Sequence, residues 1–172
     1  MTKFIILFLF ITGCNFRDSV KLHSDFVIDS NFTQEEQTYI VNGVNQWEKT
    51  TDGLVKLNLI VSNQPELYGN DTGKILQSNS YVGDTAFHIY GFTNNSPNET
   101  AITIYNNTLS KDTVNFQEII NHELGHAFGL IHVTEGLMTL SPHGILCIDT
   151  VTLNNFCIKH NCDGKNIKSD CQ

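Results

Sequence analysis

The sequence predicts an α+β domain, and three observations lead to that class. Short apolar runs bounded by polar, turn-forming residues are typical of strands. Residues 33–50 repeat their apolar side chains at helical spacing. Residues 122–132 read HELGHAFGLIH, which places histidines on one face of a helix and on the turn after it. The 172 residues suffice for one domain with a sizeable core.

The individual elements follow from local patterns. Strands are predicted at residues 26–28, 55–61, 86–90 and 101–105. The helix over 33–50 begins at an N-cap supplied by Asn31 or Thr33. Its core-facing residues are Ile40, Val44 and Trp47. A later helix carries the histidines, with Asp112 or Thr113 as its N-cap, and Asp149 caps a last helix over 150–160.

Polar segments connect these elements. Residues 62–84 are rich in Gly, Asn, Asp and Ser and are predicted to be mostly loop, and a turn joins strands 86–90 and 101–105. Asp71 and nearby carbonyls are a candidate Ca²⁺ site, but solvated turn chemistry explains the same residues, so calcium has no further support. The net charge of −8 without a basic run argues against a nucleic-acid partner.

The histidine stretch has the spacing of a catalytic metal site. His122 and His126 are four residues apart on a helix, so both imidazoles can reach one ion. Gly129 can take the left-handed conformation that ends a helix, so that the chain returns and delivers His132. Imidazoles favour zinc over magnesium or calcium, and three protein ligands leave a fourth position for water. Glu123 is placed to act on that water as general base. The alternative, surface histidines on an amphipathic helix, explains neither the glycine nor the third histidine.

The N-terminus has the pattern of an export signal. Lys3 precedes an uncharged apolar run over 4–11, too short for a permanent membrane span. The run ends in Ile-Thr-Gly-Cys14, which resembles the bacterial lipoprotein box, with lipid attached to Cys14. An ordinary signal peptide with an incidental cysteine is the alternative. Residues 1–13 are therefore predicted to be the signal peptide and the polar residues 14–23 a tether.

The remaining cysteines agree with export. They lie close together near the C-terminal end: Cys147, Cys157, Cys162 and Cys171. An even number in an oxidising compartment predicts two disulfides, with three pairings open. A second zinc site with His160 as an extra ligand is the alternative, but no CxxC pair supports it.

The motif at 122–132, followed by Gly-Leu-Met138-Thr, resembles the metzincin clan of zinc endopeptidases, and most of all its matrixin branch and small bacterial relatives. The resemblance implies a twisted mixed sheet of four to five strands, an active-site helix, a C-terminal helix, and zinc in a cleft between upper and lower subdomains. It also implies that Met138 lies under the three histidines in a Met-turn. The alternative is that Met138 is an ordinary core residue, and the two interpretations differ little because both describe a packed methionine side chain.

The same resemblance assigns further parts of the cleft. It implies that substrate lies extended along an edge strand, for which 101–105 is the candidate, and that 141–144 shape a substrate pocket. His88 resembles a structural-zinc ligand of matrixins. Because the companion His-x-Asp is missing, His88 is interpreted as an ordinary strand histidine.

The sequence thus predicts, over 24–172, a monomeric zinc endopeptidase that cleaves extracellular or envelope proteins and is held to a membrane by lipid on Cys14, or is secreted if that cysteine is not lipidated. Two alternatives stay open: a metal-dependent binding or adhesion lipoprotein without turnover, and a zinc hydrolase of a non-protein amide. The intact Glu123 argues against the first. The spacing of His132 after His126 resembles that of zinc endopeptidases, and this resemblance argues against the second.

Overall fold

The computed structural model describes residues 22–69, 71–78, 91–96, 99–105, 115–140 and 144–171. Several predictions lie outside these ranges. They are the signal peptide, the lipidation site Cys14, the strand 86–90 with His88, the caps Asp112 and Thr113, and the pocket residues 141–143.

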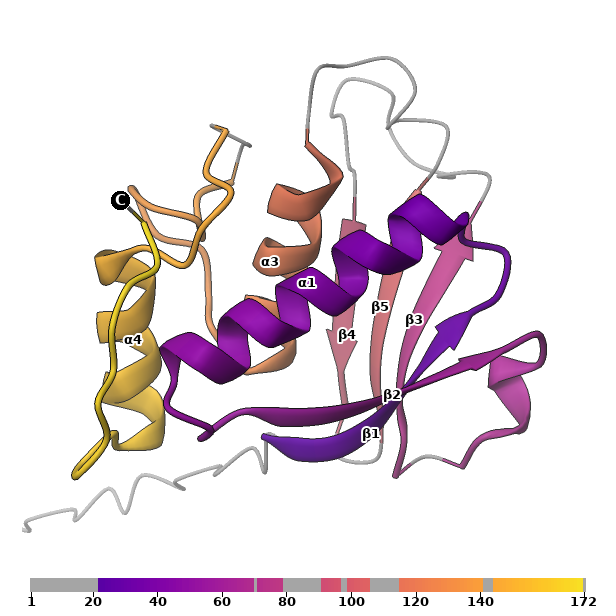
Figure 1. Cartoon of the computed structure of the whole chain (residues 1–172), viewed down its shortest axis with the longest axis horizontal. Helices are drawn as coiled ribbons and strands as arrows, with labels where there is room; N and C mark the ends of the chain where they lie inside the picture. The colour runs from indigo at the N-terminus through magenta and orange to yellow at the C-terminus, as the bar shows by residue number, and fades with distance from the viewer. Residues whose placement is uncertain are drawn as a thin grey trace, which may run out of the picture.

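The described residues form a five-stranded mixed sheet with helices packed against it (Figure 1). The strands are β1 (His23–Asp29), β2 (Lys56–Ser62), β3 (Gly73–Ser78), β4 (Gly91–Asn95) and β5 (Thr100–Tyr105). Their spatial order is β2-β1-β3-β5-β4, and every pairing is parallel except that between β4 and β5. The predicted α+β class with four to five strands is confirmed.

Helix α1 (Gln34–Thr50) begins as its sequence predicts. Thr33, the second of the two predicted candidates, is the N-cap, and its hydroxyl accepts a hydrogen bond from the Glu36 backbone N–H. The Glu36 carboxylate accepts the Thr33 N–H in return, which completes a capping box. The three predicted core residues of this helix are buried: Ile40, Val44 and Trp47.

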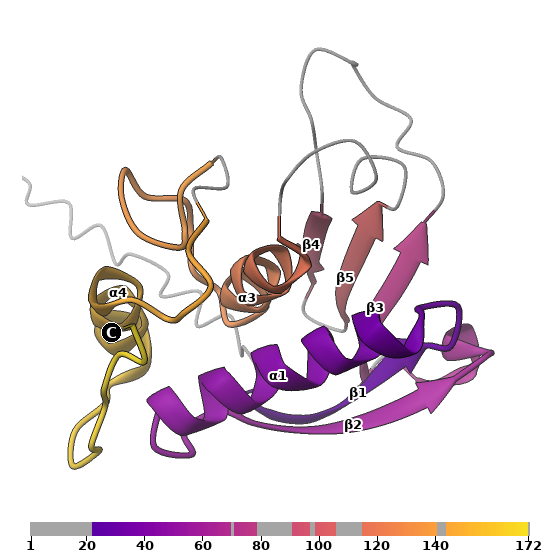
Figure 2. The same ribbon diagram turned by 45° about the horizontal axis from the view of Figure 1, so that its top comes forward.

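Helices α3 (Phe116–Ala127) and α4 (Thr150–His160) complete the domain. Helix α3 lies beside α1 and contacts β4 and β5, while α4 lies on the far side of α3 from the sheet (Figure 2). An aromatic cluster of Trp47, Phe128 and Phe156 joins the three helices, with ring centroids 5.1–6.3 Å apart. Within the described ranges, no helix is long and apolar enough to cross a membrane.

Three sequence predictions about strands are wrong. Strand β3 lies inside the predicted loop 62–84, and β4 lies inside the predicted turn before residue 100. The proposed edge strand 101–105 corresponds to β5, which is paired on both sides, so the edge strand on this side of the sheet is β4. Gly91-Phe-Thr-Asn-Asn95 has a turn-like composition, and only its pairing with β5 makes it a strand.

The two predicted disulfides are present, and the structure selects one of the three pairings. Cys147 bonds Cys171, and Cys157 bonds Cys162. The first connects the segment before α4 to the C-terminal tail, and the second closes the end of α4. The alternative of a second zinc site is wrong, because all four sulfurs are consumed in disulfides.

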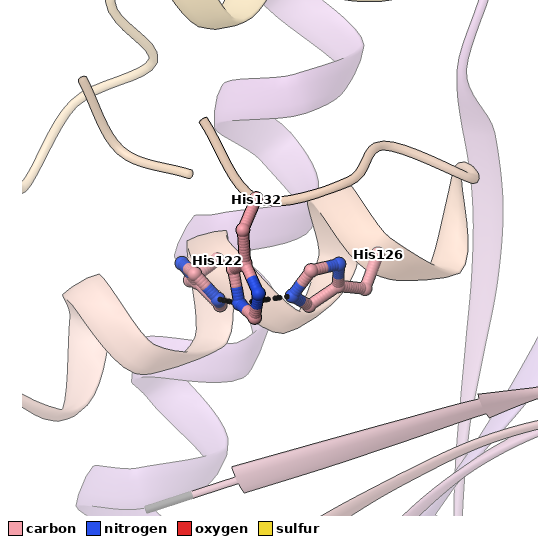
Figure 3. Close-up of side chains that lie close together, drawn as sticks. All are labelled: His122, His126 and His132. Atoms are coloured by element: carbon pink, nitrogen blue, oxygen red, sulfur yellow. Dashed lines mark hydrogen bonds between the residues drawn. The ribbon is translucent and has the colours of Figure 1, made fainter. Parts of the chain in front are cut away.

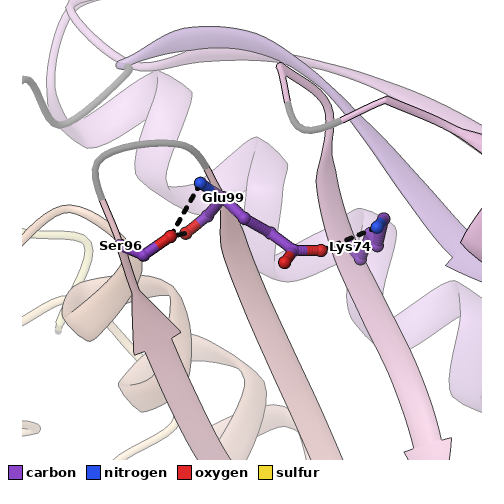
Figure 4. A network of polar contacts seen from close by, with 3 residues as sticks. All are labelled: Lys74, Ser96 and Glu99. Carbon is purple, nitrogen blue, oxygen red and sulfur yellow. Dashed lines mark hydrogen bonds and ion pairs between the residues drawn. The ribbon is translucent and has the colours of Figure 1, made fainter.

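A partly buried ion pair anchors the hairpin that carries β4, with Lys74 as its more buried member (Figure 4). Lys74 of β3 pairs with Ala101 of the neighbouring β5, and its Nζ donates over 2.6 Å to the carboxylate of Glu99, just before β5. Ser96 and Glu99 close the hairpin through a backbone hydrogen bond of 2.8 Å from the Ser96 N–H to the Glu99 carbonyl. The charge pair therefore ties the end of the β4–β5 hairpin to the middle of the sheet.

We predict that Glu99→Gln lowers the free energy of unfolding by about 1–3 kcal/mol, because the Lys74 ammonium stays largely buried without its carboxylate. Urea denaturation measures the change. Glu66→Gln, which alters an exposed carboxylate, is the control and should shift the midpoint little. Equal midpoints for Glu99→Gln and wild type would contradict the anchoring role.

Candidate metal centre

Helix α3 carries the first two histidines on a rigid support. Its N-cap is Asn115, whose side chain accepts the Gln117 N–H, so the predicted cap at Asp112 or Thr113 is wrong. Ile120 and Leu124, four residues apart on one face of the helix, are fully buried. Ile119, on the same side as the histidines, is also buried, so α3 is enclosed on both sides. A helix held this way cannot easily rotate its imidazoles out of position.

The turn after α3 reverses the chain, as predicted from Gly129. This residue has φ +79°, a left-handed conformation that glycine adopts without Cβ strain. The Gly129 N–H donates to the His126 carbonyl at 2.7 Å, and the Leu130 N–H donates to the Gly125 carbonyl at 3.0 Å. This pair of bonds is the Schellman motif. It turns the backbone so that His132 comes back over the helix.

The three histidines converge on one point (Figure 3). His132 Nε2 lies 3.2 Å from His122 Nε2 and 3.0 Å from His126 Nε2. Ligands of a tetrahedral zinc at 2.0–2.1 Å lie roughly 3.3–3.4 Å apart, so small side-chain adjustments admit the ion. The prediction that these three residues meet is confirmed.

Backbone carbonyls set the tautomers of the two helical histidines. His122 Nδ1 lies 2.8 Å from the Leu137 carbonyl oxygen, and His126 Nδ1 lies 2.8 Å from the Leu130 carbonyl oxygen. A carbonyl cannot donate, so each Nδ1 carries the proton and each Nε2 presents a lone pair in the neutral ring. Fixing the outer nitrogen this way is how proteins orient metal-binding imidazoles.

The electrostatics also favour a cation. Burial lowers the pKa of His122 to about 4, the hydrogen bond that His122 donates to the Leu137 carbonyl opposes this shift, and the neighbouring imidazoles lower the pKa further. Burial likewise lowers the pKa of His126. Both rings therefore stay neutral at pH 7. Their Nε2 atoms therefore present lone pairs toward the centre of the cluster, which fits Zn²⁺.

Glu123 lies between α3 and strand β4. Its side chain is 5% exposed, and the Thr93 hydroxyl donates to its Oε2 over 2.6 Å. Burial raises the pKa of Glu123 to about 7, although the Thr93 hydrogen bond opposes the shift. The group therefore has the basicity of a carboxylate that exchanges protons near neutral pH.

Met138 packs directly under the metal-binding helix. It is 1% exposed, and a Cβ added at Gly125 would collide with its sulfur. Gly125 lies between the two helical histidines, so its missing side chain is what lets the methionine approach. The sequence signal for this contact was the glycine inside the HELGH run. The role of Met138 as a Met-turn beneath the three histidines stays a prediction.

Asp149 connects the Met138 turn to α4. Its carboxylate caps α4 by accepting the Val151 and Thr152 N–H groups, as predicted. It also accepts the Leu137 N–H over 2.7 Å, and the carbonyl of that same residue holds His122. Gly136, at φ +81°, leaves room for the carboxylate, since a Cβ there would lie 2.6 Å from its Oδ1. Asp149 therefore helps to hold Leu137, the residue whose carbonyl orients His122.

Other residues predicted as candidates do not join the site. In the described part of the chain, groups of possible metal ligands occur at the three histidines and at Cys147, Asp170 and Cys171, whose cysteines form a disulfide. Asp71 belongs to neither group. His160 Nε2 lies 2.7 Å from the Phe128 carbonyl oxygen, which connects α4 to the end of α3.

Sequence reasoning missed two residues around the site. Thr93 lies in a segment interpreted as a turn, so no signal placed it beside Glu123. Glu118 is buried at 4% exposure and accepts the Gly144 and Ile145 N–H groups at 3.1 Å each. It connects α3 to the loop after the Met138 turn. The sequence signal for Glu118 was its charge one helical turn before His122.

Comparisons with known proteins add little to this picture. No family model matches the sequence, and no curated protein matches it. Among solved structures, the chain is similar to high choriolytic enzyme 1, a hatching-enzyme zinc protease from the medaka fish Oryzias latipes, with a TM-score of 0.40 and 18% identity. The match covers 64% of this chain and 44% of that chain. A similarity of this size does not assign a family, so the matrixin resemblance stays a prediction.

We predict that Asp149→Asn lowers the free energy of unfolding by about 1–2 kcal/mol at pH 7. Burial alone would raise the pKa of Asp149, but hydrogen bonds from Thr152, Leu137 and Val151 outweigh it and hold the pKa below its ordinary value of 3.8. The wild-type carboxylate therefore stabilises the fold above that pH and loses its effect as the pH falls through its lowered pKa. Denaturation from pH 7 to pH 3 should show the two proteins converging.

The exposed carboxyl of Glu135, in the same loop, provides the control for this series. Glu135→Gln should follow wild type at every pH. A difference between Asp149→Asn and wild type that is constant with pH would show that the carboxylate's charge is not what stabilises the cap.

Proposed function

We propose that the chain is a zinc-dependent endopeptidase. The convergence of three imidazole Nε2 atoms, 3.0 and 3.2 Å apart, next to a buried carboxylate on the same helix, carries the proposal. Three neutral nitrogen ligands are typical of a catalytic zinc site, which keeps one position for water or substrate. A structural site would be closed by a fourth protein ligand, and no fourth ligand joins the group within the described residues.

In this proposal, His122, His126 and His132 hold one zinc ion through their Nε2 atoms. When bound, the ion lowers the pKa of a water toward neutrality and polarises the substrate carbonyl. The carbonyls of Leu137 and Leu130 keep two of the imidazoles in the required tautomer. The protein supplies this geometry before substrate arrives, so little reorganisation is needed during the reaction.

Glu123 moves the protons. Its carboxylate accepts the proton of the attacking water and then transfers that proton to the amine that leaves when the peptide bond breaks. The raised pKa of Glu123, about 7, suits a group that must both accept and release a proton near neutral pH. Burial raises that pKa, so the same enclosure that excludes bulk water also sets the basicity.

Strand β4 is our candidate for the substrate-binding edge, in place of 101–105. It is the last strand of the sheet, and Thr93 and Asn95 bring it against the carbonyls of Glu123 and His126. An extended peptide that adds to a sheet edge is held mainly by backbone hydrogen bonds, with little demand on its sequence. We therefore propose unfolded or extended segments of extracellular or envelope proteins as the substrate class.

We also propose that the enzyme works outside the cytoplasm, anchored by lipid on Cys14 or else secreted. Two disulfides support an oxidising compartment. The apolar run before Cys14 supports export.

The purified protein should bind one zinc and cleave a denatured protein such as casein or gelatin. Glu123→Ala should keep the zinc and lower cleavage by about 100-fold or more, because it removes the proton acceptor but no ligand. Metal analysis and a fluorogenic peptide library measure the two properties. His126→Ala, matched on the same helix, should lose both.

Two outcomes would contradict this assignment. If wild type holds zinc but cleaves nothing in a broad library, the protein is a binding lipoprotein or acts on a non-protein amide. If Glu123→Ala cleaves as fast as wild type, another group is the proton acceptor.

Lipid anchoring has a separate test. Cys14→Ser should move the exported protein from the membrane fraction to the soluble fraction and abolish labelling with radioactive palmitate. Cys14 is the residue expected to carry the lipid, so labelling that persists in Cys14→Ser would refute the lipoprotein proposal while leaving the protease proposal intact.

A further inference from the structure

Strand β4 presents one face to the catalytic helix. Alternate residues of a strand share a face, and Gly91, Thr93 and Asn95 are the three that meet α3. Phe92, between them, is 57% exposed and points away. The side of β4 that faces α3 therefore consists of a glycine, which has no side chain, and of Thr93 and Asn95, whose side chains donate hydrogen bonds.

Thr93 contacts the side chain and the backbone of Glu123. Its hydroxyl lies 2.6 Å from Glu123 Oε2 and 3.0 Å from the Glu123 carbonyl oxygen. Within the ranges the structure describes, no other side chain donates to this carboxylate. At 5% exposure, the carboxylate also has little access to water. Thr93 is therefore its principal fixed partner.

Gly91 makes room for the same carboxylate. A Cβ at this position would lie 2.8 Å from both Cγ and Oε1 of Glu123. Contacts that short force a displacement of the side chain. Gly91 has no left-handed φ that would itself demand glycine, so the space is the relevant property. Two residues of β4, two positions apart, thus act on the two oxygens of one carboxylate.

We propose that Thr93 is a positioning residue that, with the space at Gly91, holds the Glu123 carboxylate between α3 and β4 for proton transfer. The inference rests on the proposed peptidase function. A glutamate side chain has three rotatable bonds, and a misplacement of about 1 Å in a catalytic group can reduce a rate by about 100-fold. Because Thr93 belongs to the strand proposed to bind substrate, its hydroxyl also sets the distance between the base and a peptide on that strand.

A purely structural role is the competing explanation. Asn95 donates to the His126 carbonyl and so fastens β4 to α3 without touching Glu123. If Thr93 only fastened the two elements as well, its loss would lower stability and zinc binding together. The two roles therefore differ in which measured quantity changes.

The decisive variant is Thr93→Val, which keeps the shape and removes the hydroxyl. We expect kcat to fall by about 10–100-fold, with KM and zinc stoichiometry unchanged. Thr93→Ser, which keeps the hydroxyl, should restore most of kcat. Thr103→Val is the matched control: Thr103 is the β5 partner of Phe92, on the opposite face from Thr93, and should behave as wild type.

A second readout does not depend on turnover. Crystal structures of the metal-free Thr93→Val and Gly91→Ala proteins should show the Glu123 carboxylate displaced from β4, with the backbone of α3 in place. In Gly91→Ala the displacement follows from the added Cβ, so kcat should fall there too while zinc remains bound.

The outcomes separate cleanly. If wild type cleaves peptides and Thr93→Val has the same kcat, or loses kcat, zinc and melting temperature together without rescue by serine, the positioning role is overturned and the peptidase function stands. An unmoved Glu123 carboxylate in both crystal structures overturns it as well. If wild type holds zinc but cleaves nothing, the peptidase function fails, and the positioning role falls with it.

Discussion

The convergence of three imidazoles from both sides of a helix end is the constraint on which the rest of the structure depends. Two histidines on α3 can be presented by any helix, but the third must return over that helix within six residues of His126. The left-handed Gly129 and its Schellman bonds make that return. The returning chain then supplies the Leu130 and Leu137 carbonyls that orient His126 and His122.

Two other residues, Met138 and Asp149, support the arrangement of the three histidines. Met138 occupies the space left by Gly125, and Asp149 accepts the N–H of Leu137, the residue whose carbonyl orients His122. The same aspartate begins α4, so the C-terminal helix and the metal site share one carboxylate. The aromatic cluster of Trp47, Phe128 and Phe156 then joins α4 to α1 and α3. The aromatic core and the metal site are thus connected through α4.

Strand β4 connects the chemistry to the sheet. The Lys74–Glu99 pair fastens its hairpin to β3, and Thr93 and Asn95 fasten the strand to α3. The edge strand of the sheet and the metal-binding helix are therefore held in a fixed relative position. The sequence did not predict this strand, because Gly and Asn residues suit turns when judged locally, and the energy that selects a strand comes from pairing with β5.

Local rules were sufficient for the helices and the ligands. The capping box at Thr33, the cap at Asp149, the buried faces of α1 and α3, the turn at Gly129 and the meeting of three histidines follow from residue spacing within about ten positions. The tertiary structure alone decided which strand forms the edge, which cysteines pair, and that Thr93 partners Glu123. The contacts of Thr93 with Glu123 and of Cys147 with Cys171 join residues far apart in the chain, and no local pattern contains their energies.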